Sequence, residues 1–540
     1  MSRMTIALLS CLVFLIFAWS ASPSNIIGTG WSLVPPVATI VLAFLTKEVI
    51  TALVAGAFLG CFLIGELSLF SGYTTVLQYF VDGLKDLDKV KIIFFSLGLG
   101  GLISFCNQNG GMAGVVSLFT RFAKGRASAQ LSTWALGICI FFDDYASSLV
   151  VGNTMRPTTD RMRISREKLA YIVDATSAPI ACIAPISTWI ANQLGLFGTQ
   201  IAAFPALGAH FNSYALFLAA LPFSFYAFFS ILMMFTLAIT GREFGPMLHC
   251  ERQVLKDGAA IVYGDKEQEE LENSLDKGRP GNPLFALLPI ATVLSLTMGV
   301  LYRTGSASVG ADAPLRDIIS SGSTGTALVT AAYGGCLVAI ILGLWDRRFS
   351  LTKVPTIFLT GSRAMVDAVL VLSLSWLLGR VCLEIGTATF VAAMVKTHVS
   401  YALIPTLVFL FSSLIAFATG TSWGTMGIMI PIVLGITPLH DPSLHGILLP
   451  SVAAILAGAS LGDHCSPISD TTVLSSIASK VDVLSHVRTQ IPYAGLVGLA
   501  CIAAYLLQGL LQSSTALPAF LVGCLVVLGG VRLIGVKVVN

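Results

Sequence analysis

Apolar stretches about as long as a membrane-crossing helix recur along this chain and restrict the folds open to it. Only 11% of its 540 residues are charged, against roughly 25% in soluble domains, and its mean hydropathy is +0.85. Because a helix satisfies its own backbone hydrogen bonds, such stretches cross lipid as helices. We therefore predict an all-α polytopic membrane protein. The main stretches lie near residues 31–46, 48–65, 90–108, 213–240, 284–302, 325–345, 364–382, 492–511 and 517–534.

The chain divides at its one long hydrophilic segment, residues 241–282, which we interpret as a solvated cytoplasmic loop without chemistry of its own. Residues 31–240 and 283–511 follow the same plan, so we interpret them as two inverted repeats. Residues 512–540 add a C-terminal transmembrane helix. Residues 1–22 fit either a cleaved signal peptide or a first transmembrane helix. Together the segments predict about 12 transmembrane helices.

Each repeat contains an apolar hairpin with a polar tip. Residues 131–155 carry the tip Asp143–Ser148, and residues 401–436 carry the tip Thr419–Thr425. A helix needs about 20 residues to cross the ~30 Å hydrocarbon core, and each arm is shorter than that. We therefore predict two re-entrant hairpins whose tips lie near the membrane midplane. Asp143 and Asp144 point in different directions on a helix, so we expect at most one of them to face the site closely and the other to pair elsewhere.

An interrupted span follows each hairpin. Residues 448–478 are apolar apart from Gly462–Thr472, where Pro467 removes a backbone donor and charged side chains would be costly in hydrocarbon. The segment Ala184–Trp189 has a similar sequence, and in each half it follows the hairpin at about the same distance. Unwound backbone at membrane depth is tolerated only inside protein or beside a wet cavity. Both breaks therefore predict part of an ion or substrate site.

Three motifs resemble the NhaC family of Na+/H+ antiporters: Gly462–Thr472 (GDHCSPISDTT), Phe141–Tyr145 (FFDDY) and Glu243–Met247 (EFGPM). The resemblance extends from about residue 31 to residue 511. It implies the fold of the wider ion-transporter superfamily, whose carriers are built from inverted repeats with paired hairpins. Such carriers are often dimers that move a transport unit past a scaffold. Relatives of this family also include malate/lactate exchangers and sodium-coupled amino-acid carriers.

An inverted repeat brings hairpin tips and helix breaks together, and these segments supply oxygen ligands of the kind that Na+ prefers. We hypothesise a Na+ site at Asp463, Ser469 and Asp470. A carboxylate that binds either Na+ or H+, but not both, would couple the two ions directly. The full set of predicted ion- or substrate-binding residues is Asp143, Asp144, Ser187, Thr188, Thr421, Ser422, Asp463, His464, Ser466, Ser469, Asp470 and Thr471.

Some polar residues allow two interpretations. His464 could carry a proton or merely bond to a free carbonyl. Asp174 lies six residues after Lys168, so it could belong to the site or reach the membrane surface. Arg380 and Glu384 are four residues apart near the end of a span and are expected to form an interfacial ion pair.

The predicted function is secondary active transport, with Na+/H+ antiport first and a Na+-coupled carrier of an amino acid or organic acid as the alternative. No Walker A sequence occurs, so transport would use an ion gradient rather than ATP, and the eleven cysteines lack metal-ligand spacing. We do not expect an enzyme: Asp463, His464 and nearby Ser469 could suggest a catalytic triad, but residues adjacent in sequence rarely face one another productively. A channel is disfavoured by the paired broken helices. Beyond Na+ and H+ we expect no cofactor and no nucleic acid. The expected partners are the lipid bilayer and a second copy in a homodimer, with the protein in the plasma membrane (the inner membrane of a bacterium).

Overall fold

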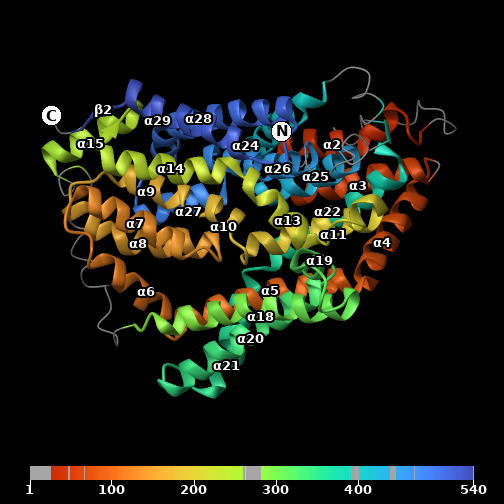
Figure 1. Ribbon diagram of the computed structural model, residues 1–540, viewed down its shortest axis with the longest axis horizontal. Coiled ribbons are helices and arrows are strands. Elements are labelled where there is room, and N and C mark those ends of the chain that lie inside the picture. The colour runs from red at the N-terminus through yellow and green to blue at the C-terminus, as the bar shows by residue number, and fades with distance from the viewer. Residues whose placement is uncertain are drawn as a thin grey trace.

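The computed structural model describes residues 26–538 except 47–48, 66, 259–261, 263–280, 388, 391–392, 394–399, 438–445 and 468 (Figure 1). The predicted signal peptide or first helix at residues 1–22 lies outside the described residues. The remainder is almost entirely helical, as the apolar stretches predict.

The first half contains thirteen helices in the described residues. In chain order they are α2 (Val34–Thr46), α3 (Val49–Ile64), α4 (Leu69–Lys85), α5 (Leu87–Gln108), α6 (Gly111–Thr120), α7 (Arg126–Cys139), α8 (Asp144–Arg161), α9 (Arg166–Ala175), α10 (Ala178–Ile183), α11 (Thr188–Ala203), α12 (Pro205–Gly208), α13 (Ser213–Ala220) and α14 (Phe225–Thr240). Short 3-10 turns, η2 (Gly30–Leu33) and η3 (Leu221–Phe223), precede α2 and α14.

Strand β1 (Arg242–Glu243) and helix α15 (Gly245–Asp257) begin the segment between the halves. The second half then comprises α18 (Leu284–Val309), α19 (Leu315–Ser320), α20 (Thr324–Trp345), η4 (Leu351–Lys353), α21 (Val354–Arg363), α22 (Val366–Glu384), η5 (Tyr401–Leu403), α24 (Ile404–Thr419), α25 (Ser422–Ile436), α26 (Leu448–Cys465), α27 (Asp470–Ser479), α28 (Val483–Leu511), α29 (Leu517–Ile534) and strand β2 (Val536–Lys537). Strands β1 and β2 pair antiparallel, with Arg242 opposite Lys537.

Seven helical segments of the described residues are long and apolar enough to cross a membrane, and one of them, Arg166–Ala203, comprises α9, α10 and α11. The number rises to nine if two bent helix pairs are each one span. The short apolar helices α24 and α25 fall outside this set, in keeping with the short arms seen in the sequence. The predicted total of about 12 spans and the two inverted repeats stay predictions.

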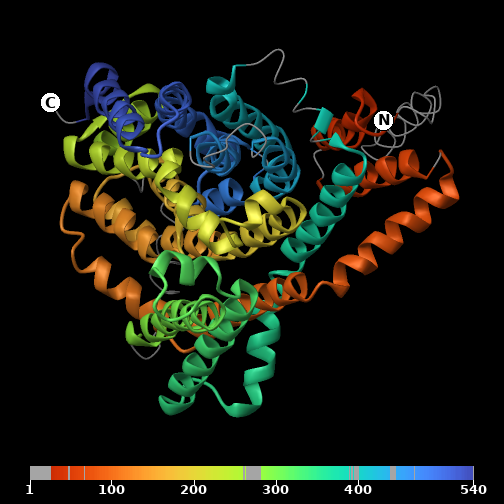
Figure 2. The same cartoon turned by 45° about the vertical axis from the view of Figure 1, so that its right-hand side comes forward.

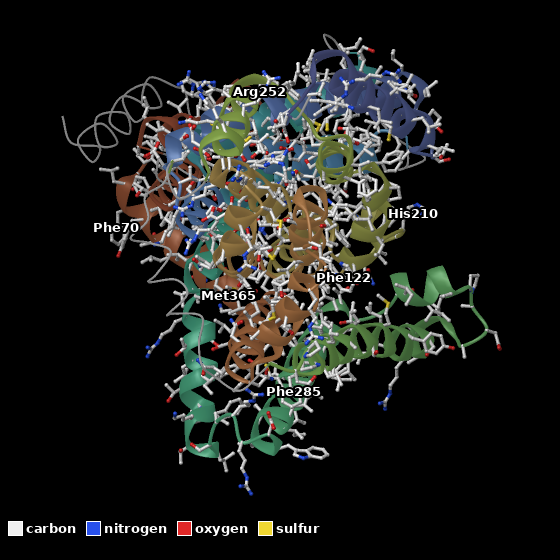
Figure 3. All side chains as sticks on the ribbon, turned by 90° about the vertical axis from the view of Figure 1, so that its left-hand side faces the viewer. Phe70, Phe122, His210, Arg252, Phe285 and Met365 are labelled. Atoms are coloured by element: carbon white, nitrogen blue, oxygen red, sulfur yellow. The ribbon has the colours of Figure 1, made fainter. Side chains whose placement is uncertain are left out.

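The broken helices form one body. In Figure 1, α7–α10, α14 and α24–α29 lie together, and α5, α18, α20 and α21 lie beneath them. Figure 2 shows α4 descending from the α2–α3 pair towards α5. In the orthogonal view, Arg252 of α15 lies near the top of the molecule, Met365 and Phe285 of α18 lie lower down, and green helices extend below Phe285 (Figure 3).

Helices α24 and α26 pack with their backbones in close approach. A Cβ atom on Gly462 would lie 2.2 Å from the carbonyl oxygen of Ser413 and 2.6 Å from the backbone nitrogen of Phe417. Gly458, one turn earlier, is similarly close to the carbonyl oxygen of Phe409, at 2.4 Å. Small residues of this kind let membrane helices approach each other closely.

We expect Gly462→Ala to destabilise the protein, because the clash involves backbone atoms that a side-chain rotation cannot move. Overpacking of this kind typically costs about 1–3 kcal/mol. Thermal unfolding of the purified protein in detergent measures the effect. Gly495→Ala on α28 is the control: a Cβ there meets no atom within 4 Å. Equal melting temperatures for the two variants would contradict the close-packing argument.

The segment after residue 240 is not a plain solvated connector, which corrects the sequence interpretation for its first part. Glu243 and Glu251 are both buried. Glu243 forms an ion pair with Lys168, and Glu251 pairs with Arg126 and accepts a hydrogen bond from the backbone of Ser165. The high charge content concealed this because the partners lie far away in the sequence.

Candidate ion-binding site

Four helix breaks meet at one place in the molecule. They separate α7 from α8, α10 from α11, α24 from α25 and α26 from α27. Gly420 ends α24 with a left-handed φ of +69°, a conformation that suits glycine. The backbone N–H of Thr188, the first residue of α11, donates to the carbonyl of Phe142 at 2.9 Å and so joins the first two breaks.

These breaks surround a cavity of about 320 Å³. Its carboxylates are Asp143, Asp144, Asp463 and Asp470, and no Lys, Arg or His side chain is among its described lining residues. The other lining residues are Tyr145, Thr188, Ala364, Met365, Val371, Gly420, Thr421, Ser422, Trp423, Thr471, Val473 and Leu474. The cavity is thus strongly acidic and closed on one side by apolar residues from around the start of α22.

Asp463 accepts hydrogen bonds at both carboxylate oxygens and is only 3% exposed. The Ser469 hydroxyl donates to its Oδ1 at 2.8 Å, and the Thr471 hydroxyl donates to its Oδ2 at 3.0 Å. Both donors come from the start of α27, across the break from Asp463. Hydroxyl donors orient the carboxylate without neutralising it, so its charge remains available to a cation.

Two of the other three acids accept hydrogen bonds from aromatic side chains. Asp144 accepts a hydrogen bond from the indole of Trp189 at 2.7 Å, and Asp470 accepts one from the hydroxyl of Tyr145 at 3.2 Å. Asp143 and Asp144 both line the cavity. This differs from the expectation that at most one of them would face it. Because α8 begins at Asp144, Asp143 lies outside the helix and the angular spacing of helical neighbours does not apply.

Eight of the twelve predicted site residues line the cavity: Asp143, Asp144, Thr188, Thr421, Ser422, Asp463, Asp470 and Thr471. Ser469 lies behind Asp463 as its hydrogen-bond donor. Ser187 caps α11, accepting from the backbone of Ile190 and donating to the carbonyl of Ala181. Ser466 is buried outside the lining. His464 also lies outside it: its Nδ1 is 2.6 Å from the hydroxyl of Tyr226.

Within the described part of the chain, no three or more His, Cys, Asp or Glu side chains are grouped to hold a metal ion. A Na+ ion at Asp463 would therefore complete its shell with hydroxyl and carbonyl oxygens. The C-terminal ends of α7, α10, α24 and α26 all lie at the breaks, and helix ends present carbonyls without intrahelical partners.

A family model described as the Na+/H+ antiporter family matches residues 180–510, more than half of the chain. This chain belongs to the Na+/H+ antiporter family. The match includes three of the four helix breaks and the carboxylates Asp463 and Asp470. As a member of this family, the protein is a multi-pass membrane protein and a secondary active transporter, not an enzyme, and the family implies Na+ and H+ as the transported ions.

Relatives of this antiporter extend the comparison. A protein of Haemophilus influenzae, described as uncharacterized, is 31% identical over 494 residues, which are 90% of this chain and 92% of that protein. The malate-2H+/Na+-lactate antiporter of Bacillus subtilis is 41% identical over 118 residues, 19% of this chain and 24% of that protein. Among solved structures, Neisseria gonorrhoeae MtrF, from a report on antimetabolite efflux pumps, superposes with a TM-score of 0.54 at 13% sequence identity. The match covers 81% of this chain and 84% of the MtrF chain. That likeness concerns the fold alone.

Proposed function

We propose that the protein exchanges Na+ for H+ at the carboxylates of this cavity. The observation that carries the proposal is Asp463, a buried carboxylate with two hydroxyl donors and no Lys or Arg partner among the described residues, facing a cavity with three further acids. A carboxylate in this setting needs either a proton or a metal cation, because an unpaired buried charge is costly. Na+ and H+ then compete for one group, and each ion displaces the other.

The charge of the cavity favours cations over anions. A dicarboxylate would meet four acids without a Lys or Arg beside them. The second candidate function is Na+-coupled transport of an amino acid, whose ammonium group suits these acids. Two observations support it: the cavity is larger than one ion requires, and the N-termini of α8, α11, α25 and α27 open onto it. Helix N-termini bind carboxylates well. An organic acid without an ammonium group is less well matched.

The cavity also suggests how transport proceeds. Its acidic side is built from the broken helices, whereas Ala364, Met365 and Val371 close it from around α22. We place the moving boundary between these two sides, so that the broken helices carry the ion past α22. The proposal also includes two inverted repeats, residues 31–240 and 283–511. It further includes a homodimer and a location in the plasma membrane of a bacterium.

The proposed exchange can be tested in proteoliposomes that contain an internal pH probe and carry an imposed pH gradient. We expect Na+ alone to collapse the gradient, with saturation, whereas choline at the same concentration leaves it intact. The assay is repeated with a panel of amino acids and organic acids. A response that requires one of these solutes would favour the coupled carrier, and no response to Na+ under any condition would contradict both candidates.

A further inference from the structure

A second buried acid lies on the other side of α27 from the cavity. Asp174, on α9, is 1% exposed. Its Oδ2 accepts hydrogen bonds from Gln490 at 2.9 Å and from Thr472 at 3.2 Å, and it lies 3.2 Å from the Nε2 of His486. The Ser475 hydroxyl is 3.5 Å from its Oδ1. Asp174 therefore does not reach the membrane surface, which was one of the two interpretations that its sequence position allowed.

Of these hydrogen-bond partners His486 can bring a positive charge, and the Nε2 of His464 lies farther away, 3.8 Å from the same oxygen. His486 is fully buried, and its Nδ1 has no hydrogen-bond partner in the described part of the chain. It lies in the first turn of α28, four residues after the N-cap Asp482. A neutral imidazole with one nitrogen on a carboxylate and the other unused can take up a proton, and the resulting ion pair is stable in a buried site.

Several titratable groups surround this pair, and the Nε2 of His464 lies 3.8 Å from the Oδ2 of Asp174. The other titratable neighbours are Asp463 and Cys465 of α26 and Tyr171 of α9. Tyr226 of α14 contacts His464, and Lys168 of α9 lies over the ring of Tyr171. Lys168 is matched by Glu243 of β1, which also accepts a hydrogen bond from Tyr493 of α28. On the other elements packed against α9, Glu251 of α15 pairs with Arg126 of α7, and Arg156 of α8 binds the carbonyl of Ala478.

Two side chains connect the pair to the cavity. The Thr472 hydroxyl lies 3.2 Å from Asp174 and 3.3 Å from the backbone carbonyl of Asp463. Its single proton can serve one acceptor at a time. Gln490 donates both to Asp174 and to the carbonyl of His464. The charge state at Asp174 therefore acts on the backbone that carries Asp463.

We propose that Asp174 and His486 form a second proton-binding site, which releases its proton when Na+ binds at Asp463. This inference rests on the proposed function, because it assigns part of the proton binding and release in that exchange to Asp174 and His486. A cation in the cavity repels a proton on the neighbouring pair, and the low dielectric of the buried site strengthens the repulsion. Thr472 and Gln490 add a structural route for the same coupling.

Titration calorimetry tests the inference. Na+ is added to the full-length purified protein in buffers of different ionisation enthalpy, which measures the protons released for each Na+ bound. We expect His486→Gln and Asp174→Asn to bind Na+ still, with the number of released protons lowered by about half. His249→Gln, at an exposed position of α15, should match the wild-type number.

The outcomes separate the two proposals. Wild-type protein that binds Na+ without releasing protons would contradict the proposed exchange itself. If the wild type releases protons and both variants release the same number, the second site is refuted. Folded variants that no longer bind Na+ would also refute it, because Asp174 and His486 would then only support the cavity. Thr472→Val, which keeps the pair and removes the shared hydroxyl, should release fewer protons than the wild type, and an unchanged number would refute the coupling.

Discussion

Asp463→Asn should abolish the Na+-driven collapse of a pH gradient in proteoliposomes. Asparagine keeps the size of the side chain: its oxygen can accept from one of the two hydroxyls of Ser469 and Thr471, and its amide group can donate to the other, so the local fold should persist. The change removes the charge that attracts Na+ and the group that takes up the competing proton. Loss of an ion ligand should weaken the apparent affinity for Na+ by about 100-fold or more, which corresponds to about 2.8 kcal/mol.

Two further variants make this result specific. Asp346→Asn, at a partly exposed position where the aspartate pairs with Arg348, should leave exchange unchanged. Asp470→Asn should have a smaller effect than Asp463→Asn, because Asp470 is exposed and is held by the hydroxyl of Tyr145. Full exchange by Asp463→Asn at wild-type Na+ concentrations would rule out this carboxylate as the shared binding group.

The positions of the helix breaks could be predicted from sequence because they depend on local chemistry. Pro467 and Gly420 interrupt apolar runs, and the polar residues beside them cannot remain in lipid. The structure ends α26 at Cys465 and begins α27 at Asp470, within the stretch that the sequence indicates. The ion pair of Arg380 with Glu384, at 3.1 Å, is confirmed for the same reason, since one helical turn decides it.

The groups that hold the acids could not be predicted in the same way. Trp189 and Tyr145 reach Asp144 and Asp470 only because separate breaks meet in space. His486 stands near the start of an apolar span, and nothing in its neighbouring residues indicates that it lies against an acid 312 positions away. Helix α4 was also missed, because residues 69–85 mix polar and apolar side chains and lack the even apolarity of a span.

Removing only one member of the Lys168–Glu243 pair should destabilise the protein strongly. Both side chains are almost completely buried, and Nζ lies 2.8 Å from Oε1. Lys168 also lies over the rings of Tyr171 and Tyr493, at 5.5 and 5.2 Å from their centroids. Either Lys168→Met or Glu243→Gln leaves the other group buried without its counter-charge, which typically costs about 3–5 kcal/mol. Thermal unfolding in detergent measures the loss.

The double variant Lys168→Met/Glu243→Gln should recover most of that stability. Burial raises the pKa of the Glu243 carboxyl above its usual value even though Lys168 acts in the opposite direction. Removing both charges from water is costly, so a buried pair of this kind typically contributes little net stability. Glu384→Gln, which breaks the exposed pair with Arg380, is the matched control and should cost no more than about 1 kcal/mol. A double variant as unstable as either single variant would show that the contacts of these side chains with Tyr171 and Tyr493, and not charge balance, hold β1 against α9.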